Sequence, residues 1–172
     1  MEHFETYICI TRLGQESFIS EEAKRFPVPP QCTELAPGVV ELSGISAKEL
    51  QQNPLFFACQ LLPNPQKLAA QSIKSWATLV VEQLTERLDP SPSEWGLHVF
   101  EQASAESGKQ YSRARLIEQE ILAVLKQKRR SLLKGLANKD AAPTTLVQLL
   151  LTSPDEGYLS ISHPSDFEAL NP

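Results

Sequence analysis

The side chains best suited to chemistry in this sequence are the lysines and arginines of "LKQKRRSLLKG", residues 125–135. Residues 109–139 hold nine Lys and Arg against two acids, a net charge of +7, whereas the rest of the chain carries −12. Together they give the formal charge of −5 for the 172 residues. Clustered cations repel one another, and a polyanion such as a nucleic-acid backbone would supply the missing counter-charge.

A helix is expected to position these cations. The stretch "SRARLIEQEILAVLKQKRRSLLKGL", residues 112–136, predicts one long helix that ends near Gly135. On a helical wheel its apolar residues share one face and most of its cations lie opposite. Lys128 falls in the apolar sector, so either its stem lies along the apolar surface or the helix bends there. The candidate RNA-binding residues are Lys109, Arg113, Arg115, Lys126, Lys128, Arg129, Arg130 and Lys134.

Two interpretations of this charge pattern remain open. The cations can form a solvated face that also complements the carboxyl end of the helix dipole. They can instead bind phosphates, which would make affinity fall steeply with salt and carry little base specificity. Only Tyr111 interleaves the cations as an aromatic residue, so structured RNA recognised by its shape is favoured over single strands.

The remaining elements predict an α+β fold in two parts. The first part has a strand at residues 6–13, a helix within 14–26 and a hairpin about the turn Pro37-Gly38. The capping-box pattern "SAKE" then opens a short helix at Ser46. The apolar run "PLFFACQLLP" indicates a buried strand, although a helical turn is an alternative there.

The second part follows a turn-rich seam at residues 63–66. An apolar stripe predicts a helix over 72–88, "WGLHVFEQ" predicts a strand, and "TTLVQLLLTSPDEGYLSIS" predicts two strands about a turn. The order is β-α-β-β-α-β followed by α-β-α-β-β, with helices on one face of each small sheet. The predicted core residues are Phe56, Phe57, Ile73, Trp76, Val80, Ile121 and Leu125.

Several classes of function lack their motifs. The seven glycines never fall as G-x-G, and neither a phosphate-binding loop nor a G-x-S-x-G nucleophile motif occurs. Cys59 with His98 and an acid could be posed as a thiol triad, but its apolar surroundings in "FFACQLL" favour a core residue. Scattered Cys and His give no metal ligand set. No signal peptide or membrane-spanning run is evident, so we expect a cytoplasmic protein. Because the catalytic motifs are missing, we expect that this chain is not itself a catalyst.

Four segments carry a resemblance to a known family: "NPLFFACQLLPNPQKLAAQSIKSWA", "EWGLHVFEQ", "SRARLIEQEILAVLKQKRRSLLKGL" and "TLVQLLLTSPDEGYLSIS". Together they resemble the amino-terminal region of the bacterial ribosomal RNA large subunit methyltransferase M group, over residues 6–161. These enzymes are 2′-O-ribose methyltransferases that act on a cytidine of the large ribosomal RNA.

The resemblance implies a ferredoxin-like subdomain at residues 1–64 and a THUMP-like RNA-binding subdomain at 65–172. It implies large-subunit rRNA as the partner and a C-terminal methyltransferase domain, absent from this chain, that uses S-adenosylmethionine. No cofactor is expected in the chain itself, which is predicted to be a fragment of the enzyme. The alternative from the charge pattern is a protein-interaction module that docks an acidic partner through its basic helix.

Overall fold

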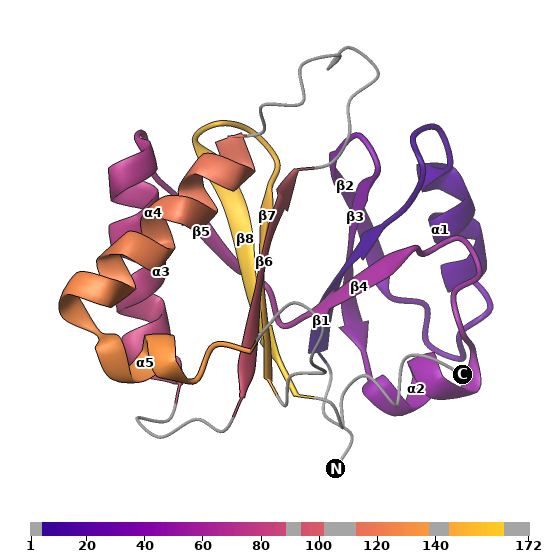
Figure 1. Cartoon of the computed structure of the whole chain (residues 1–172). Helices are drawn as coiled ribbons and strands as arrows, with labels where there is room; N and C mark the ends of the chain where they lie inside the picture. Colours follow the sequence, from indigo (N-terminus) through magenta and orange to yellow (C-terminus); the bar gives the residue numbers. More distant parts are fainter. Residues whose placement is uncertain (1–4, 89–93, 102–112, 138–144, 164–172) are drawn as a thin grey trace. The chain divides into compact units, whose positions relative to one another are not determined.

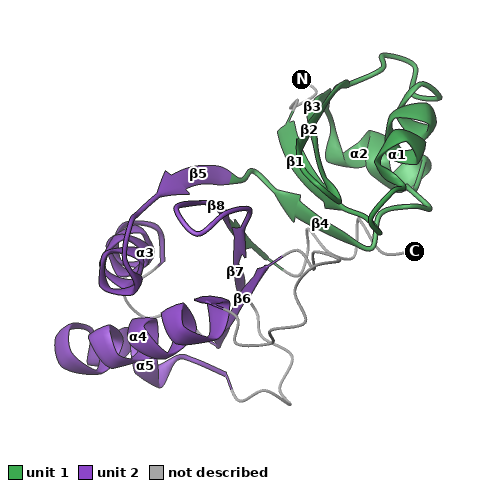
Figure 2. Ribbon diagram, turned by 90° about the horizontal axis from the view of Figure 1, so that it is seen from above, with its two compact units in different colours: residues 1–65, 102–106, 160–172 green, residues 66–101, 107–159 purple. Residues whose placement is uncertain are grey.

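The computed structural model describes residues 5–88, 94–101, 113–137 and 145–163. The chain divides into two compact units, one formed by residues 1–65, 102–106 and 160–172 and the other by residues 66–101 and 107–159 (Figure 2). Helices accompany two separate four-stranded sheets. The α+β class predicted from the sequence is therefore confirmed.

The first sheet has the strand order β2-β3-β1-β4, and every neighbouring pair is antiparallel. Tyr7 and Cys9 of the central strand β1 pack with Ile19 of α1 and Leu50 of α2 in one buried cluster, so both helices cover the same face of the sheet (Figure 2). The elements are β1 (Glu5–Ile10), α1 (Glu16–Ala23), β2 (Gln31–Ala36), β3 (Val39–Ile45), α2 (Ala47–Gln52) and β4 (Gln60–Pro63).

The predicted turn at Gly38 and the predicted helix cap at Ser46 are both present in this unit. Gly38 has a φ of 77° in the turn between β2 and β3, a conformation that costs glycine little because it has no Cβ. Ser46 is the N-cap of α2, and its side chain accepts a hydrogen bond from the backbone N–H of Glu49 at 3.2 Å. The hairpin and the short helix are thus confirmed.

The segment before β4 differs from its prediction. Residues 54–59 form neither helix nor strand, and β4 begins only at Gln60. Phe56 and Phe57 are 80% and 39% exposed, and Cys59 is exposed too. Their assignment to the core was therefore wrong. The cause is a contact distant in sequence, since the Glu22 carboxylate accepts hydrogen bonds from the N–H groups of Phe56 and Phe57 and holds the segment at the surface.

The second sheet has the strand order β5-β8-β7-β6, in which β5 pairs antiparallel with β8 and β6 pairs parallel with β7. Helices α3 and α4 lie side by side on one face of it (Figure 1). Strand β5, only four residues long, was not predicted. The elements are β5 (Gln66–Ala69), α3 (Ile73–Arg87), β6 (Trp95–Glu101), α4 (Arg113–Lys128), α5 (Arg130–Lys134), β7 (Thr145–Leu151) and β8 (Glu156–Ser162).

The core of this unit follows the predicted apolar stripes. Trp76, Val80, Ile121 and Leu125 are fully buried, whereas Ile73 is half-buried at the start of α3. The indole N–H of Trp76 donates to the carbonyl of Pro154 at 3.0 Å, so its polar atom is satisfied inside the core. Among the described residues, no helix is long and apolar enough to cross a bilayer.

Gly157 in β8 is a point where a side chain cannot be accommodated. A Cβ there would lie 2.6 Å from the backbone oxygen of Leu150 and 3.3 Å from the Trp76 ring. We expect Gly157→Ala to lower the free energy of unfolding by about 2 kcal/mol or more, because overpacking against backbone forces strands β7 and β8 to shift. Urea denaturation measures the change. Gly44→Ala is the comparison, since a Cβ there meets nothing and only its φ of 81° opposes the substitution.

Candidate nucleic-acid interface

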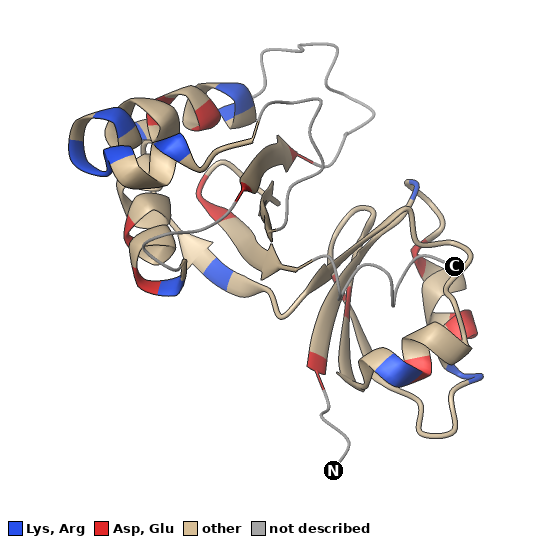
Figure 3. Ribbon diagram, turned by 60° about the horizontal axis from the view of Figure 1, so that its bottom comes forward, with Lys and Arg blue, Asp and Glu red and all other residues tan. Residues whose placement is uncertain are grey.

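The apolar face of α4 and α5 decides which side chains face solvent. Ile117, Ile121 and Leu125 of α4 and Leu132 of α5 are buried, and α4 packs against α3 and β6. This anchoring turns the opposite side of the two helices outward. Figure 3 shows Lys and Arg gathered on the α4 and α5 ribbons.

The predicted single helix is in fact two. Helix α4 ends at Lys128, Arg129 has a φ of −143° and a ψ of 63°, and α5 starts at Arg130. Neither Gly nor Pro marks this break. Its signal in the sequence is Lys128, which falls in the apolar sector of a continuous helix, so the predicted alternative of a bend is confirmed. The Arg129 side chain joins α4 to α3, because its Nε donates to the Thr85 hydroxyl at 3.3 Å and an NH donates to the carbonyl of Lys128.

Lys128 lies directly before the break, and the predicted end of the segment at Gly135 is confirmed. Lys128, which a continuous helix would place in the apolar sector, is exposed as the last residue of α4. Gly135 is the C-cap residue of α5, as expected. Beyond it, the Ala137 N–H donates to the backbone oxygen of Trp95, which joins the end of this segment to β6.

Five predicted RNA-binding residues lie together around the break: Lys126, Lys128, Arg129, Arg130 and Lys134, here called the basic cluster. All five side chains are exposed. Within the described parts of the chain, no salt bridge joins any of them to a carboxylate; the ion pair found there is Lys24–Glu21 in the first unit. Among the described residues, the cations of the basic cluster therefore form no salt bridge with a neighbouring acid.

The other candidates differ from the basic cluster. Arg113 is half-buried, and its guanidinium donates to the carbonyls of Pro154 and Gln71 at 3.2 and 3.1 Å. These bonds fasten the start of α4 to the loops beside it, which is a structural use of two of its five donors. Arg115 is exposed about three turns of α4 before the basic cluster begins. Lys109 lies outside the described residues.

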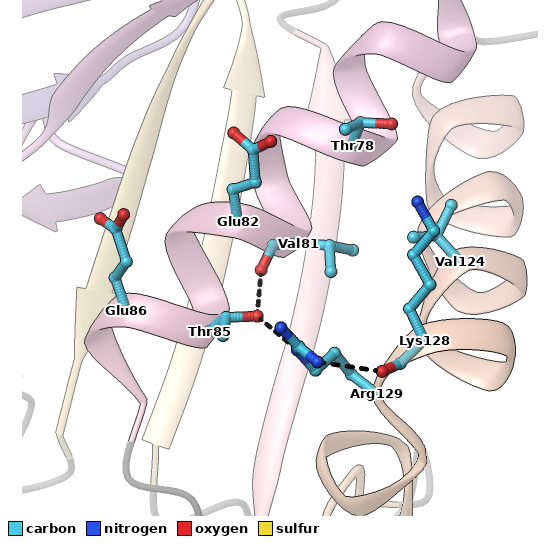
Figure 4. A pocket seen from close by; sticks show the side chains of 8 residues that line it. All are labelled: Thr78, Val81, Glu82, Thr85, Glu86, Val124, Lys128 and Arg129. Carbon is cyan, nitrogen blue, oxygen red and sulfur yellow. Dashed lines mark hydrogen bonds between the residues drawn. The ribbon is translucent and has the colours of Figure 1, made fainter.

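A shallow groove of about 460 Å³ borders the basic cluster between α3 and α4 (Figure 4). Lys128 and Arg129 lie on the α4 side, with Val81 and Val124 between the helices. The α3 side carries Glu82 and Glu86, whose carboxylates lower the positive potential there. A polyanion is thus favoured along α4 and α5, not along α3.

Thr85 is the residue of this interface that the sequence did not reveal. Its hydroxyl donates to the carbonyl of Val81 at 2.8 Å and accepts from Arg129, so it orients a guanidinium 44 residues away (Figure 4). A threonine on a helix gives no sequence signal for such a role.

No group of three or more His, Cys, Asp or Glu able to hold a metal occurs in the described part of the chain.

Comparisons with known proteins find solved structures that share this fold. A possible methylase of Clostridium difficile 630 matches 92% of this chain with a TM-score of 0.57 at 15% identity. TrmN from Thermus thermophilus matches 91% with a TM-score of 0.55 at 14% identity. A Listeria monocytogenes protein predicted to be an N6-adenine-specific DNA methylase matches 92% with a TM-score of 0.52 at 15% identity.

These matches establish a shared fold. The chain spans 41%, 45% and 40% of the lengths of those three structures. No family model and no curated protein matches the sequence. The chain thus shares its fold with a part of each of these three structures, and that part makes up less than half of their length.

Proposed function

We propose that the basic cluster binds the phosphate backbone of structured RNA. The observation that carries this proposal is five exposed cations within nine residues, none paired with a carboxylate in the described part of the chain. The helix break spreads these cations over the end of one helix and the whole of a second, so they can follow a curved row of phosphates. Such contacts position an RNA without reading its sequence.

The cluster serves a larger enzyme in this proposal. Residues 1–64 form a ferredoxin-like subdomain and residues 65–172 a THUMP-like one, which together present RNA to a C-terminal methyltransferase domain. That domain holds S-adenosylmethionine and methylates the ribose 2′-hydroxyl of a cytidine in large-subunit rRNA in the cytoplasm. Support comes from the fold, which recurs within a possible and a predicted methylase more than twice as long as this chain, and from the four segments that resemble the rRNA methyltransferase group.

An acidic protein partner is the second candidate. The observation in its favour is the groove beside the cluster, because Val81 and Val124 give an apolar side chain of a partner a place to pack. Salt would weaken this association as well. An RNA site should prefer structured RNA over another polyanion of equal charge, whereas a site for an acidic protein should not.

The deciding experiment is a fluorescence-anisotropy titration of the chain with a structured fragment of large-subunit rRNA. Heparin, which matches its charge but lacks its A-form geometry, serves as competitor. We expect binding that survives a charge excess of heparin yet weakens roughly 100- to 1,000-fold between about 50 and about 200 mM salt, as about five phosphate contacts predict. Displacement by equal charge of heparin would instead indicate an acidic-partner site, and no binding at low salt would exclude the RNA role.

A further inference from the structure

Glu22 on α1 shapes a second surface, in the first unit. Its side chain is buried at 6% exposure, and its two oxygens accept hydrogen bonds from consecutive backbone N–H groups, Phe56 at 2.7 Å and Phe57 at 2.9 Å. Burying a carboxylate is costly unless such bonds compensate it. These two hydrogen bonds also hold residues 54–59 in place, a segment that has no helix or strand of its own.

The fixed segment holds aromatic rings in solvent. Phe56 is 80% exposed, and the Phe57 ring stacks on Phe18 with centroids 4.7 Å apart, both rings being exposed as well. A phenyl ring held outward by a buried carboxylate contributes little to the stability of the fold. It is, however, preorganised for contact with a ligand, since no order has to be imposed on the loop when the ligand binds.

A hollow of about 250 Å³ adjoins Phe56 and has a mixed lining. The exposed side chains of Gln52 and Arg25 border it, together with Asn53. The Asn53 amide nitrogen donates to the carbonyl of Glu49 at 3.4 Å, while its side-chain oxygen has no hydrogen bond within the described residues. The apolar residues Pro54, Leu55 and Phe56 and the Glu22 carboxylate complete the lining, and the carboxylate already accepts two backbone hydrogen bonds. The space is too small for most drug-sized ligands.

We propose that this hollow binds a single unstacked nucleobase of RNA. The base lies on the Phe56 ring, the Gln52 and Asn53 amides meet its hydrogen-bonding edge, and Arg25 pairs with the attached phosphate. Aromatic stacking with edge recognition is how proteins hold splayed-out RNA bases. A base with its phosphate offers partners both to the apolar lining and to the amides and the guanidinium, whereas an apolar side chain of a protein offers partners only to Pro54, Leu55 and Phe56.

The inference rests on the proposed function in one respect, because RNA is the ligand in both. The two sites differ in chemistry and lie on different units, the basic cluster binding phosphates and the hollow beside Phe56 binding a base. They can therefore fail separately. A mononucleotide, which offers one base and too few phosphates to occupy the cluster, reports on the hollow alone.

The test is a titration of the 15N-labelled chain with each of the four ribonucleoside 5′-monophosphates at millimolar concentrations, followed by NMR. We expect shifts at the backbone amides of Phe56 and Phe57 and at the side-chain amides of Gln52 and Asn53. Phe56→Ala should weaken binding about 5- to 100-fold, and Phe56→Trp should retain it, because stacking needs only the ring. Phe56 is exposed, so neither substitution threatens folding.

Three results would overturn the inference. They are the absence of shifts near Phe56, shifts that Phe56→Ala leaves unchanged, and displacement of the nucleotide by a short apolar peptide that binds the hollow more tightly. The last result would identify a protein-docking site. In the variant Lys126→Glu, Arg130→Glu, Lys134→Glu, mononucleotide shifts should persist, which keeps failure of the cluster distinct from failure of the hollow.

Discussion

The triple variant Lys126→Glu, Arg130→Glu, Lys134→Glu is expected to bind structured RNA roughly 100- to 1,000-fold more weakly than the parent chain at about 0.1 M salt. Each phosphate contact releases condensed counterions, so losing three contacts removes about 2.7 from the slope of log affinity against log salt concentration. The three side chains are exposed, so their replacement leaves the core of the fold intact. Anisotropy titrations at several salt concentrations measure both affinity and slope.

A matched control separates position from net charge. Lys48→Glu, Lys67→Glu, Lys74→Glu changes the chain's charge by the same amount at three other lysines, on α2, β5 and α3. If the basic cluster is the interface, this control keeps a steep salt slope and loses little affinity. Equal losses in both variants would mean that RNA responds to net charge alone, and the proposed site would be wrong.

The three substitutions should slightly lower the free energy of unfolding. Arg130 Nε donates to the carbonyl of Lys126 at 3.1 Å, and acids replace cations near the carboxyl end of α4, where the helix dipole favours positive charge. Together these changes should cost about 1 kcal/mol. Circular dichroism during thermal unfolding therefore accompanies the binding measurement, and a cooperative transition confirms that weak binding is not loss of fold.

Trp95→Phe is expected to lower the free energy of unfolding by about 1–3 kcal/mol, and Trp95→Ala by about 3–5 kcal/mol. Trp95 is fully buried, and its indole N–H donates to the carbonyl of Leu132 in α5 at 2.7 Å. Phenylalanine fills most of the space but removes the indole donor, which leaves the Leu132 carbonyl with the Gly135 N–H at 3.1 Å, whereas alanine also leaves a cavity. Urea denaturation measures both changes.

Trp95→Phe should also affect the basic cluster, because Trp95 holds α5 in place. The indole bond and the bond from Trp95 N–H to the carbonyl of Gly135 tie α5 to β6. Trp95→Phe should therefore speed hydrogen exchange at the amides of Leu133 and Gly135 and loosen the helix that carries Arg130 and Lys134. We expect RNA affinity to fall about 3- to 10-fold, since disorder in α5 must be removed on binding.

Trp76→Phe is the matched control, because Trp76 is equally buried and also bonds a backbone carbonyl, that of Pro154. It should cost similar stability yet leave exchange in α5 close to that of the parent. If Trp95→Phe leaves both stability and α5 exchange unchanged, the indole bond to Leu132 does not position the basic cluster.

The sequence by itself determined the features that depend on neighbouring residues. The turn at Gly38 needs a residue without a Cβ, and the cap at Ser46 needs an oxygen three residues before Glu49, so both were predictable. Apolar spacing likewise placed Trp76 and Ile121 in the core of an α+β fold. The separation of charge into a basic segment and an acidic remainder is a property of composition, and it is sufficient to indicate the candidate interface.

Tertiary structure decided what depends on partners far away in the chain. The break at Arg129 involves Thr85, 44 residues earlier, and the exposure of Phe56 follows from Glu22, 34 residues earlier. Arg113 became an anchor because the carbonyl of Pro154 lies within its reach. Local patterns do not contain such contacts, because each joins residues at least 34 positions apart in the sequence.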